Sequence, residues 1–366
     1  MSSNKKNIII HDNFEIYGGA EQLLFQFSKA LKIKIFSFYV NKKINNSYFS
    51  KFFFSNKSNF DPRIRFLLNF IFYFFFPFNF KKYNNILLSG HFSLMLLKKG
   101  LNNKIIYFCH SPPRFIFDNY KLYKKKYKFV YSFILTKKLI SIYRNIYIKK
   151  LKLCNIIICN SNTSKKRISK YISQKNIHVI YPGIDFKKYY TKKNENFYLS
   201  LSRLHWSKRI IEKIITFSNH KLKNTKLIIC SHGPLEKKIK KIIKNLEVKN
   251  IEFLGKVTDK KKISLLSTCK GLIHIPIREE FGIINLEAIA SKKILITTDG
   301  GDFEKIFFNN KNVKIIKNYS NSKLLNIIHK IEKNKFKFKP YNSKKFKKKF
   351  SINNSINQIN KFFKSN

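Results

Sequence analysis

Two glutamates on either side of a glycine predict a site for hydroxyl groups in the last third of the chain. Glu279 and Glu287 stand eight positions apart, with Gly282 between them. The apolar run at 271–276 predicts a buried strand, and the apolar spacing after Gly282 predicts a helix. Glu279 is therefore expected in the turn, where its carboxylate can accept hydrogen bonds, while the free N–H groups around Gly282 favour an anion. One site would thus suit a polyol that carries a phosphate.

A pair of cations follows the first predicted strand of the second half. Arg203 and Lys208 come directly after the apolar run Phe197–Ser202. A guanidinium and an ammonium at one strand end can bind a diphosphate together.

The glutamate pair and the cation pair also have an ordinary interpretation. Two glutamates at this spacing can belong to a surface turn and an amphipathic helix, and two cations in so basic a chain can be solvated side chains.

In the first half of the chain, one histidine and one glycine pair are the candidates for chemistry. His110 follows the predicted strand Lys104–Cys109, at the end where parallel sheets bind ligands. Gly18 and Gly19 precede a predicted helix and would let the backbone approach a ligand closely. A lone histidine is more often structural, however, and a glycine pair is more often simply a turn.

The composition is strongly basic, because 75 Lys+Arg against 19 Asp+Glu give a formal charge of +56. Taken literally, this charge predicts binding to nucleic acid or to an anionic membrane surface. Lys, Asn, Ile, Phe and Tyr are all frequent, however, and all are encoded by A/T-rich codons, so a mutational bias explains the excess better. The lysines are also spread along the whole chain, as solvated faces would be. We therefore expect no nucleic-acid partner.

Strand-like and helix-like segments alternate along the chain, which predicts an α/β fold with parallel sheets. A break at Tyr181–Asp185 separates two such series. We expect a Rossmann-like domain over 1–183, a second over 184–340, and a C-terminal helical tail over 341–366 that packs back on the first domain. The expected strands are Ile8–His11, Ile33–Tyr39, Ile86–Ser89, Lys104–Cys109, Asn155–Cys159, His178–Tyr181, Phe197–Ser202, Lys226–Cys230, Ile251–Leu254, Leu272–Ile275 and Ile294–Thr297.

The longest apolar tract, Phe66–Phe80, is too short for a spanning helix, which needs roughly 20 apolar residues. Basic residues flank it, as in a segment that lies at the interface of an anionic bilayer. It can equally be a core helix or an acceptor-side loop of the first domain. We expect no signal peptide, because the apolar stretch Asn7–His11 is too short for one, and the five cysteines form no Cys-x-x-Cys pair. We expect reduced thiols and a cytoplasmic protein, with peripheral contact at the inner face of the cytoplasmic membrane left open.

The segment Arg278–Ala288 resembles the donor-sugar motif of the retaining glycosyltransferases of family 4, in which two glutamates flank a Phe-Gly. The resemblance extends from about Asn7 to about Phe307. It implies the GT-B fold, which consists of two facing Rossmann-like domains with a cleft between them. The first domain would bind the acceptor and the second the nucleotide sugar.

The resemblance also implies a role for each candidate residue. Glu279 would contact hydroxyls of the transferred sugar, and Glu287 the ribose of the nucleotide. Arg203 and Lys208 would bind the donor diphosphate. His110 lies in a run similar to the His-Ser/Thr-Pro-x-Arg segment of a mannosyltransferase-like subgroup, which implies that it faces the donor sugar and the reaction centre. The other donor-binding residues implied are Gly18, Gly19, Gly233, Val257, Phe281, Gly282 and Ile283.

For the activity, the resemblance implies retaining transfer of a hexose to a glycan or lipid-linked acceptor in surface polysaccharide synthesis, with GDP-mannose as donor. The sequence contains neither an Asp-x-Asp motif nor a zinc-like His/Cys spacing, so we expect catalysis without a metal or other cofactor. Two alternatives stay open. One is a UDP-sugar-dependent transferase of the same fold, and the other is a basic nucleic-acid- or surface-binding protein with a Rossmann-like body.

One departure from the family pattern follows the second glutamate. The family usually continues with Ala-x-Gly-x-Pro-Val-Ile, whereas Ala290–Ile296 has Lys292 at the glycine position and Ile294 at the proline position. The change falls in a turn away from the proposed site. We therefore expect it to affect local stability more than chemistry.

Overall fold

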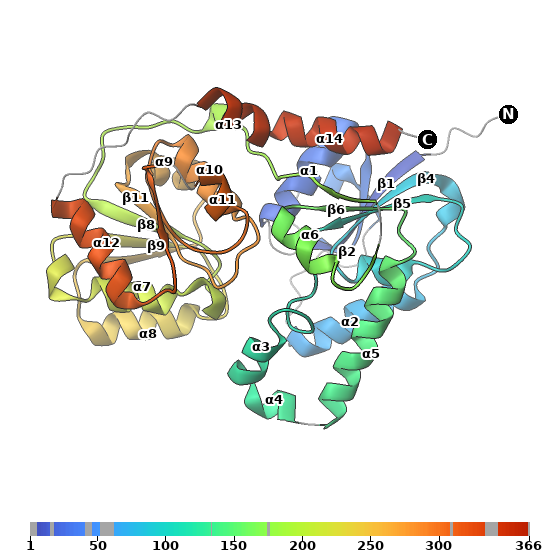
Figure 1. Cartoon of the computed structure of the whole chain (residues 1–366), viewed down its shortest axis with the longest axis horizontal. Coiled ribbons are helices and arrows are strands. Elements are labelled where there is room, and N and C mark those ends of the chain that lie inside the picture. The colour runs from blue at the N-terminus through green and yellow to red at the C-terminus, as the bar shows by residue number, and fades with distance from the viewer. Residues whose placement is uncertain are drawn as a thin grey trace. The chain divides into compact units, whose positions relative to one another are not determined.

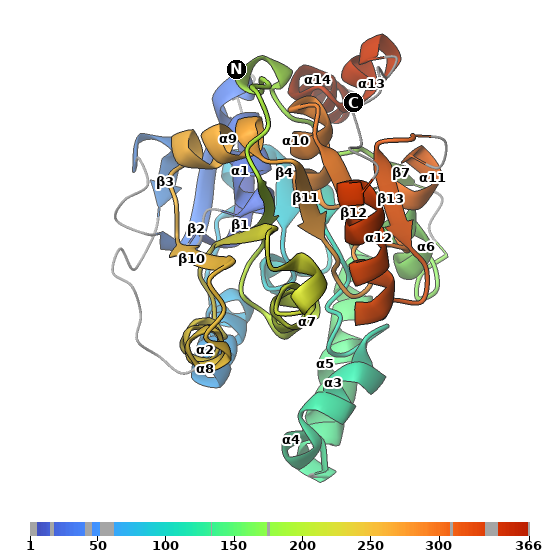
Figure 2. The same cartoon turned by 90° about the vertical axis from the view of Figure 1, so that its left-hand side faces the viewer.

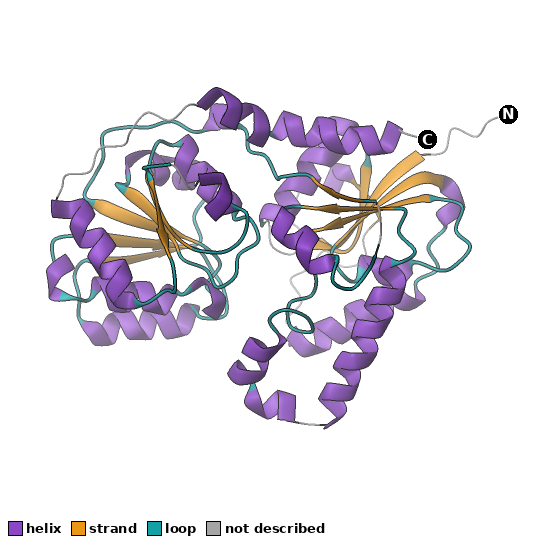
Figure 3. Ribbon diagram, viewed as in Figure 1, coloured by secondary structure: helices purple, strands orange, loops and turns teal. Residues whose placement is uncertain are grey.

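The computed structural model describes residues 6–14, 18–40, 46–51, 62–132, 134–173, 176–307, 310–333 and 343–364. The chain divides into two compact units, one formed by Met1–Pro182 with Asn353–Asn366 and the other by Gly183–Ile352. Each unit contains one parallel sheet with helices on its faces (Figure 1, Figure 3). The predicted α/β class with two Rossmann-like sheets is confirmed.

The first unit holds a seven-stranded sheet in the order β3-β2-β1-β4-β5-β6-β7. The strand order reverses between β1 and β4, so the carboxyl ends of these two strands form the switch point at which such sheets bind ligands. Register places His11 of β1 beside Ser89 of β4. The strands are β1 (Lys6–Phe14), β2 (Lys34–Val40), β3 (Phe49–Lys51), β4 (Tyr83–Ser89), β5 (Lys104–Cys109), β6 (Ile156–Cys159) and β7 (Ile177–Val179).

The helices of this unit cover the sheet with apolar faces. In α1, Leu23, Leu24 and Phe27 are buried at helical spacing. Near-continuous apolar strands such as Ile156–Cys159 are buried along their whole length, as expected for a parallel sheet covered on both faces. The helices are α1 (Gly19–Leu31), α2 (Pro62–Phe75), α3 (Tyr120–Lys126), α4 (Lys128–Ser132), α5 (Ile134–Leu151), α6 (Asn162–Ile168) and α14 (Ile352–Lys364), with short 3₁₀ turns at η1 (Asn46–Tyr48), η2 (Phe80–Lys82) and η3 (Ser93–Leu96).

The apolar tract Phe66–Phe80 forms most of α2 and the segment after it. Tyr73 is fully buried, and its hydroxyl donates hydrogen bonds to the carbonyl oxygens of His11 at 2.7 Å and Asp12 at 2.9 Å. The tract therefore contributes to the core of the first unit, one of the two interpretations left open. The other face of α2 still exposes Leu67, Leu68, Ile71 and Phe75. Within the described ranges, no helix is both long and apolar enough to cross a membrane.

The second unit holds a six-stranded sheet in the order β10-β9-β8-β11-β12-β13, seen from its own side in Figure 2. Here the order reverses between β8 and β11. The strands are β8 (Phe197–Leu201), β9 (Lys226–Cys230), β10 (Ile251–Gly255), β11 (Gly271–His274), β12 (Ile294–Thr298) and β13 (Val313–Ile316), and the helices are α7 (Ile210–Phe217), α8 (Glu236–Leu246), α9 (Asp259–Thr268), α10 (Ile283–Ala290), α11 (Phe303–Phe307), α12 (Asn321–Lys333) and α13 (Ser343–Phe350).

The C-terminal segment differs from the single tail expected over 341–366. It forms two helices, and α13 belongs to the second unit. Phe346 of α13 contacts Phe186 and Phe307, with ring centroids 5.7 and 5.3 Å apart. Most of α14 belongs to the first unit, where the Ser355 hydroxyl donates to the Tyr181 carbonyl at 2.7 Å. The expectation that the tail as a whole packs on the first domain was wrong for α13, because its phenylalanines pack against other aromatic rings of the second unit.

Candidate active site

The candidate site of the second unit lies at its switch point, where the loops after β8 and β11 meet. The backbone N–H of Ile277 donates to the carbonyl of Ser207 at 2.7 Å. Arg209 donates from Nη1 to the carbonyls of Ile275 and Pro276, at 3.3 Å each. These bonds join the loop that carries Arg203 and Lys208 to the loop that carries Glu279. The role of Arg209, which lies at the start of α7 and joins the two loops, was not predicted from the sequence.

Glu279 lies in the turn between β11 and α10, as its spacing predicted. Its Oε2 forms an ion pair with Nζ of Lys208, and both side chains are mostly buried. Nε2 of His274, the last residue of β11, lies 3.8 Å from the same oxygen. The turn thus brings a carboxylate, an ammonium group and an imidazole to one point.

His274 is a site residue that the sequence analysis did not identify. Its side chain is buried, and Nδ1 lies 2.8 Å from Oδ1 of Asn285 on α10. Because an amide oxygen only accepts, Nδ1 carries the proton and Nε2 is bare. Burial, together with the charge of Lys208, lowers the pKa of His274 to about 3. The ring is therefore neutral at physiological pH.

Glycine is favoured at position 282 because the backbone has φ +74° and the neighbouring side chains leave little room for a Cβ atom. A Cβ atom there would lie 3.0 Å from Nδ2 of Asn285 and 3.1 Å from Cε1 of His274. Helix α10 begins at Ile283, directly after this glycine, so its first N–H groups have no acceptor within the helix. Phe281 is buried beside them. The turn can therefore present both backbone N–H groups and a carboxylate to one ligand.

Glu287 lies one turn further along α10 and is almost fully buried. Its Oε1 lies 3.1 Å from Nζ of Lys262 on α9. Burial and the neighbouring Glu287 raise the pKa of Tyr189. The other oxygen, Oε2, is buried and has no hydrogen-bond partner within the described part of the chain. Such an oxygen costs roughly 1–3 kcal/mol or more if it stays unsatisfied, and both the neighbouring Tyr189 hydroxyl and a ligand hydroxyl are fitting donors for it.

The remaining predicted donor residues lie around the same sheet edge. The Arg203 side chain is exposed and forms no ion pair with any residue that the structure describes. Lys208 is paired with Glu279 instead, so the two cations contact no common group among these residues. Gly233 packs against Leu204, since a Cβ atom would lie 2.7 Å from the Leu204 carbonyl oxygen. Val257 is partly buried, two residues after the end of β10. A further oxygen, Oγ of Ser202 at the end of β8, is buried without a partner among the described residues.

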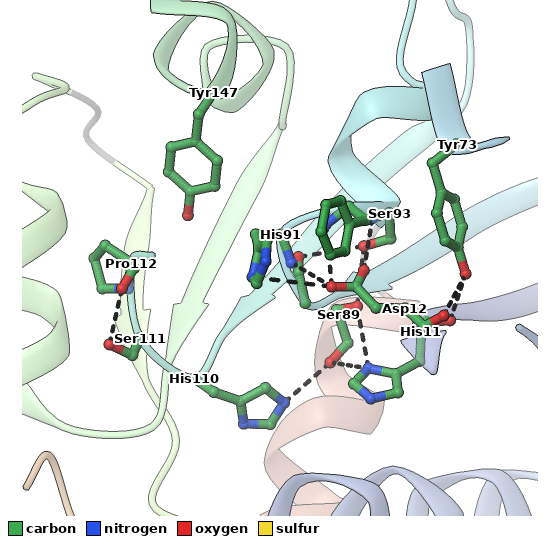
Figure 4. A network of polar contacts seen from close by, with 12 residues as sticks. His11, Asp12, Tyr73, Ser89, His91, Ser93, His110, Ser111, Pro112 and Tyr147 are labelled. Atoms are coloured by element: carbon green, nitrogen blue, oxygen red, sulfur yellow. Dashed lines mark hydrogen bonds and ion pairs between the residues drawn. The ribbon is translucent and has the colours of Figure 1, made fainter. Parts of the chain in front are cut away.

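A second polar cluster occupies the switch point of the first unit (Figure 4). Nδ1 of His11 lies 3.1 Å from both the carbonyl oxygen and the hydroxyl of Ser89, and that hydroxyl lies 3.0 Å from Nε2 of His110. On its other side, Nε2 of His11 lies 3.6 Å from Oε1 of Glu21. Four side chains from distant parts of the chain thus form one connected row that ends at His110.

Burial and neighbouring charges shift the pKa values of His11, Glu21 and His110 in this row. Burial opposes the charge on His11, but the hydrogen bond and the charge of Glu21 outweigh it and raise the pKa of His11. Burial likewise opposes ionisation of Glu21, yet the bond to His11 lowers the pKa of Glu21. Burial, reinforced by the charge of His11, lowers the pKa of His110 to about 3. The hydrogen bond and the charges in this row thus favour a charged His11–Glu21 pair behind a neutral His110.

The tautomer of His110 follows from this arrangement. When His11 is protonated it can only donate, and the Ser89 hydroxyl can then direct its own proton to Nε2 of His110. The proton of His110 then lies on Nδ1, on the side of the ring away from Ser89 in Figure 4. His110 can therefore offer a hydrogen-bond donor to a ligand rather than act as a base. The sequence predicted a role for His110, but it did not predict Ser89 and His11 as its partners.

The glycines predicted beside the donor have a local function in this row. The N–H of Gly18 donates to Oε2 of Glu21 at 3.1 Å, and a Cβ atom on Gly18 would lie 2.8 Å from that oxygen. Gly19 is the first residue of α1. The nearby Asp12 carboxylate accepts three backbone N–H groups, those of residues 91, 92 and 93, at 2.7–3.1 Å. The absence of a side chain at Gly18 thus leaves space for the Glu21 carboxylate, which pairs with His11.

Comparison with known proteins gives two family models that together span nearly all of the chain. A model described as Glycosyltransferase Family 4 matches residues 17–188, and one described as Glycosyl transferases group 1 matches residues 182–350.

Curated relatives are similar at modest identity. The alpha-1,3/1,6-mannosyltransferase ALG2 of Candida glabrata is 25% identical over 260 residues, covering 57% of this chain and 54% of the relative. The O-antigen chain mannosyltransferase RfbU of Salmonella typhimurium is 27% identical over 166 residues, covering 43% and 46%. This chain thus spans about half the length of the curated relatives it matches.

Solved structures share the fold along the full length. Anabaena HepE in complex with UDP is 16% identical and superposes with a TM-score of 0.73, covering 98% of this chain and 99% of that one. Sucrose-phosphate synthase from Thermosynechococcus elongatus is 13% identical, with a TM-score of 0.74 and 98% of each chain covered. At these identities, the likeness concerns the fold alone.

Proposed function

The chain belongs to the family 4 glycosyltransferases with the GT-B fold, and on this premise we propose that it transfers a hexose from a nucleotide sugar to a glycan or lipid-linked acceptor. The observation that carries the proposal is the arrangement at the switch point of the second unit. Glu279 and Glu287 lie on either side of the start of α10, and Oε2 of Glu287 is buried without a donor among the described residues. A nucleotide sugar brings hydroxyls for both carboxylates and a diphosphate for the first N–H groups of the helix.

Each residue has a distinct task in the proposed reaction. Glu279 accepts hydrogen bonds from the transferred sugar, and Glu287 accepts one from the ribose. On donor binding, Lys208 turns from Glu279 to the diphosphate, where Arg203 joins it. The sugar–phosphate bond breaks through an oxocarbenium-like state that is stabilised electrostatically. We further propose retention of configuration, with the leaving diphosphate taking the acceptor's hydroxyl proton on the face where the new bond forms.

GDP-mannose is the donor that we propose first. The relatives from Candida glabrata and Salmonella typhimurium are both mannosyltransferases, and the run that begins at His110 resembles the mannosyltransferase-like subgroup. A UDP-sugar is the second candidate, because the HepE structures contain UDP or UDP-glucose. The O-antigen relative favours a place in surface polysaccharide synthesis, at the cytoplasmic face of a membrane where such acceptors would be found.

We also propose that no metal ion is needed. The support is the pair of cations, Arg203 and Lys208, together with the N-terminus of α10, which can meet the charge of a diphosphate. Activity in excess EDTA should then equal activity in magnesium. A complete loss in EDTA that magnesium restores would show that an ion neutralises the diphosphate instead.

A thermal-shift panel of GDP-, UDP- and ADP-sugars tests the proposal and ranks the donors. A donor at about 100 times its dissociation constant should stabilise the protein by roughly 2.7 kcal/mol. Transfer is then measured with radiolabelled donor and membrane extract as acceptor source. The absence of a shift with every nucleotide sugar, combined with DNA binding that falls steeply with salt, would overturn the proposal in favour of the nucleic-acid alternative.

A further inference from the structure

The helices α3, α4 and the first half of α5 project together from the sheet of the first unit (Figure 1, Figure 2). We define this arm as residues 120–142. Its surface is apolar to an unusual extent, because it exposes five large apolar side chains, namely Tyr127, Phe129, Ile134, Leu139 and Ile142. Phe129 and Ile134 are 77% and 81% exposed. These values are high for residues that normally stabilise a core.

The exposed apolar side chains are concentrated near the arm rather than scattered. Twelve large apolar side chains are exposed among the described residues, and four of those outside the arm lie on α2. Helix α2 packs beside α5, since the ring of Tyr143 lies 5.4 Å from that of Phe66 and 5.7 Å from that of Phe70. Nine of the twelve therefore belong to this one helical region. A concentration of this kind marks an interaction surface.

The charge of the arm is of one sign. It contains seven lysines and no acidic residue, and the sequence has no Asp or Glu anywhere between Asp118 and Asp185. Lys121, Lys124, Lys125, Lys128 and Lys137 line one hollow together with Tyr131 and Ser132. Codon bias can raise the numbers of lysine, phenylalanine and isoleucine, but it does not determine that exposed members of all three gather on one arm. A partner must therefore be anionic and must also accept apolar side chains.

We propose that this arm docks on an anionic phospholipid bilayer, with the lysines on the phosphate groups and Phe129 and Ile134 in the acyl boundary. A bilayer interface offers both chemistries over one surface, and lysines near it gain from its negative potential. A nucleic-acid partner would use the lysines but would leave the aliphatic side chains in water. The proposal does not depend on sugar transfer, because the arm contains none of the residues assigned to the donor.

Co-sedimentation with vesicles tests the proposal. The full chain should bind vesicles that contain phosphatidylglycerol and should bind pure phosphatidylcholine weakly. The triple variant Lys124→Gln, Lys125→Gln, Lys128→Gln should lose on the order of 100-fold in partitioning, since each lysine near an anionic surface contributes roughly fivefold. The control variant Lys237→Gln, Lys238→Gln, Lys241→Gln removes the same charge from exposed positions on α8 of the second unit. It should bind as the natural sequence does.

The apolar contribution is measured separately. Phe129→Ser with Ile134→Ser should weaken binding at high salt, whereas Ile215→Ser, a 49% exposed position on α7, should not. A Phe129→Cys variant can be labelled selectively because all five native cysteines are buried, and a polarity-sensitive fluorophore there should shift to the blue on anionic vesicles. The proposal is overturned if the α3–α4 and α8 variants bind alike, if the fluorophore does not shift, or if only DNA is bound. Unchanged thermal unfolding excludes misfolding as the cause of a loss.

Discussion

The hydroxyl group of Ser89 lies 3.0 Å from Nε2 of His110, and by donating to that nitrogen it would leave the ring proton on Nδ1. Ser89 can donate to that nitrogen when His11, which the same hydroxyl also contacts, is protonated, and the hydrogen bond and charge of Glu21 favour that state by raising the pKa of His11. His110 thus keeps Nδ1–H available for a ligand. The sequence identified the histidine, and the structure identifies the hydrogen bond that fixes its tautomer.

Ser89→Ala should therefore slow transfer by about tenfold, because one orienting hydrogen bond is worth roughly 1–1.5 kcal/mol. The loss should appear in kcat rather than in KM for the donor if the Nδ1–H contact strengthens in the transition state. The ¹⁵N shifts of the His110 ring report its tautomer directly. Ser93→Ala is the matched control, since Ser93 donates to the Ser89 carbonyl but does not contact His110. An unchanged tautomer in Ser89→Ala would contradict the assignment.

Glu279 and Glu287 should affect different kinetic constants. Glu279→Gln should lower kcat, because the sugar becomes cationic in the transition state. Glu287→Gln should mainly raise KM for the donor, because ribose contact is the same in the ground and transition states. Steady-state kinetics with varied donor measures both, and circular dichroism checks folding. A Glu279→Gln effect on KM alone, with kcat abolished in a folded Glu287→Gln protein, would reverse the two roles.

Arg203→Ala should reduce kcat/KM by roughly 10²–10³-fold, as expected for the loss of one electrostatic stabiliser. Its side chain is exposed and unpaired within the described residues, so the substitution should leave the unfolding temperature unchanged. Lys223→Ala, another exposed cation of the same unit, is the control for charge. Near-normal turnover in the Arg203 variant would show that the diphosphate is bound elsewhere.

His274 should make the second unit less stable in acid. Its pKa is about 3 in the folded protein and near 6.5 when unfolded, so the unfolded chain binds the extra proton between these values. Stability is therefore complete above about pH 6.5 and falls as the pH drops, by up to about 1.4 kcal/mol per unit. His274→Gln cannot take up that proton, so its urea midpoint should vary less between about pH 6 and about pH 4. Equal pH dependence of the two proteins would show that folding does not lower the pKa of His274.

Lys292→Gly should stabilise the protein. Lys292 has φ +54° at the position where the family usually has glycine, and a non-glycine residue in that region costs roughly 1–2 kcal/mol. The greater freedom of glycine in the unfolded chain offsets about 0.5–1 kcal/mol of the gain. A rise of a few degrees in the unfolding temperature is expected, while Lys292→Ala should bring no gain. Ser291→Gly, at an ordinary negative φ one residue earlier, should destabilise.

The sequence by itself determined the elements whose signals are local. The strands β5 and β9 were predicted to the residue, and Glu279 and Gly282 were placed correctly in the turn before a helix. Apolar periodicity and turn chemistry are properties of neighbouring residues, so one stretch of sequence contains them. The short edge strands β3 and β13 were not predicted, and the equally short β7 was predicted with shifted bounds, because three or four residues carry little pattern.

Only the tertiary structure decided which side chains meet. His11 and Ser89 are 78 positions apart in the sequence, and strand pairing at the switch point of the first unit brings them into contact. In the second unit, the loops after β8 and β11 bring Lys208 to Glu279, and the helices α9 and α10 bring Lys262 to Glu287. The division of the C-terminal helices between the two units also depended on which aromatic surfaces were available. Pairing across such distances is set by the order of strands in a sheet, and no local pattern specifies that order.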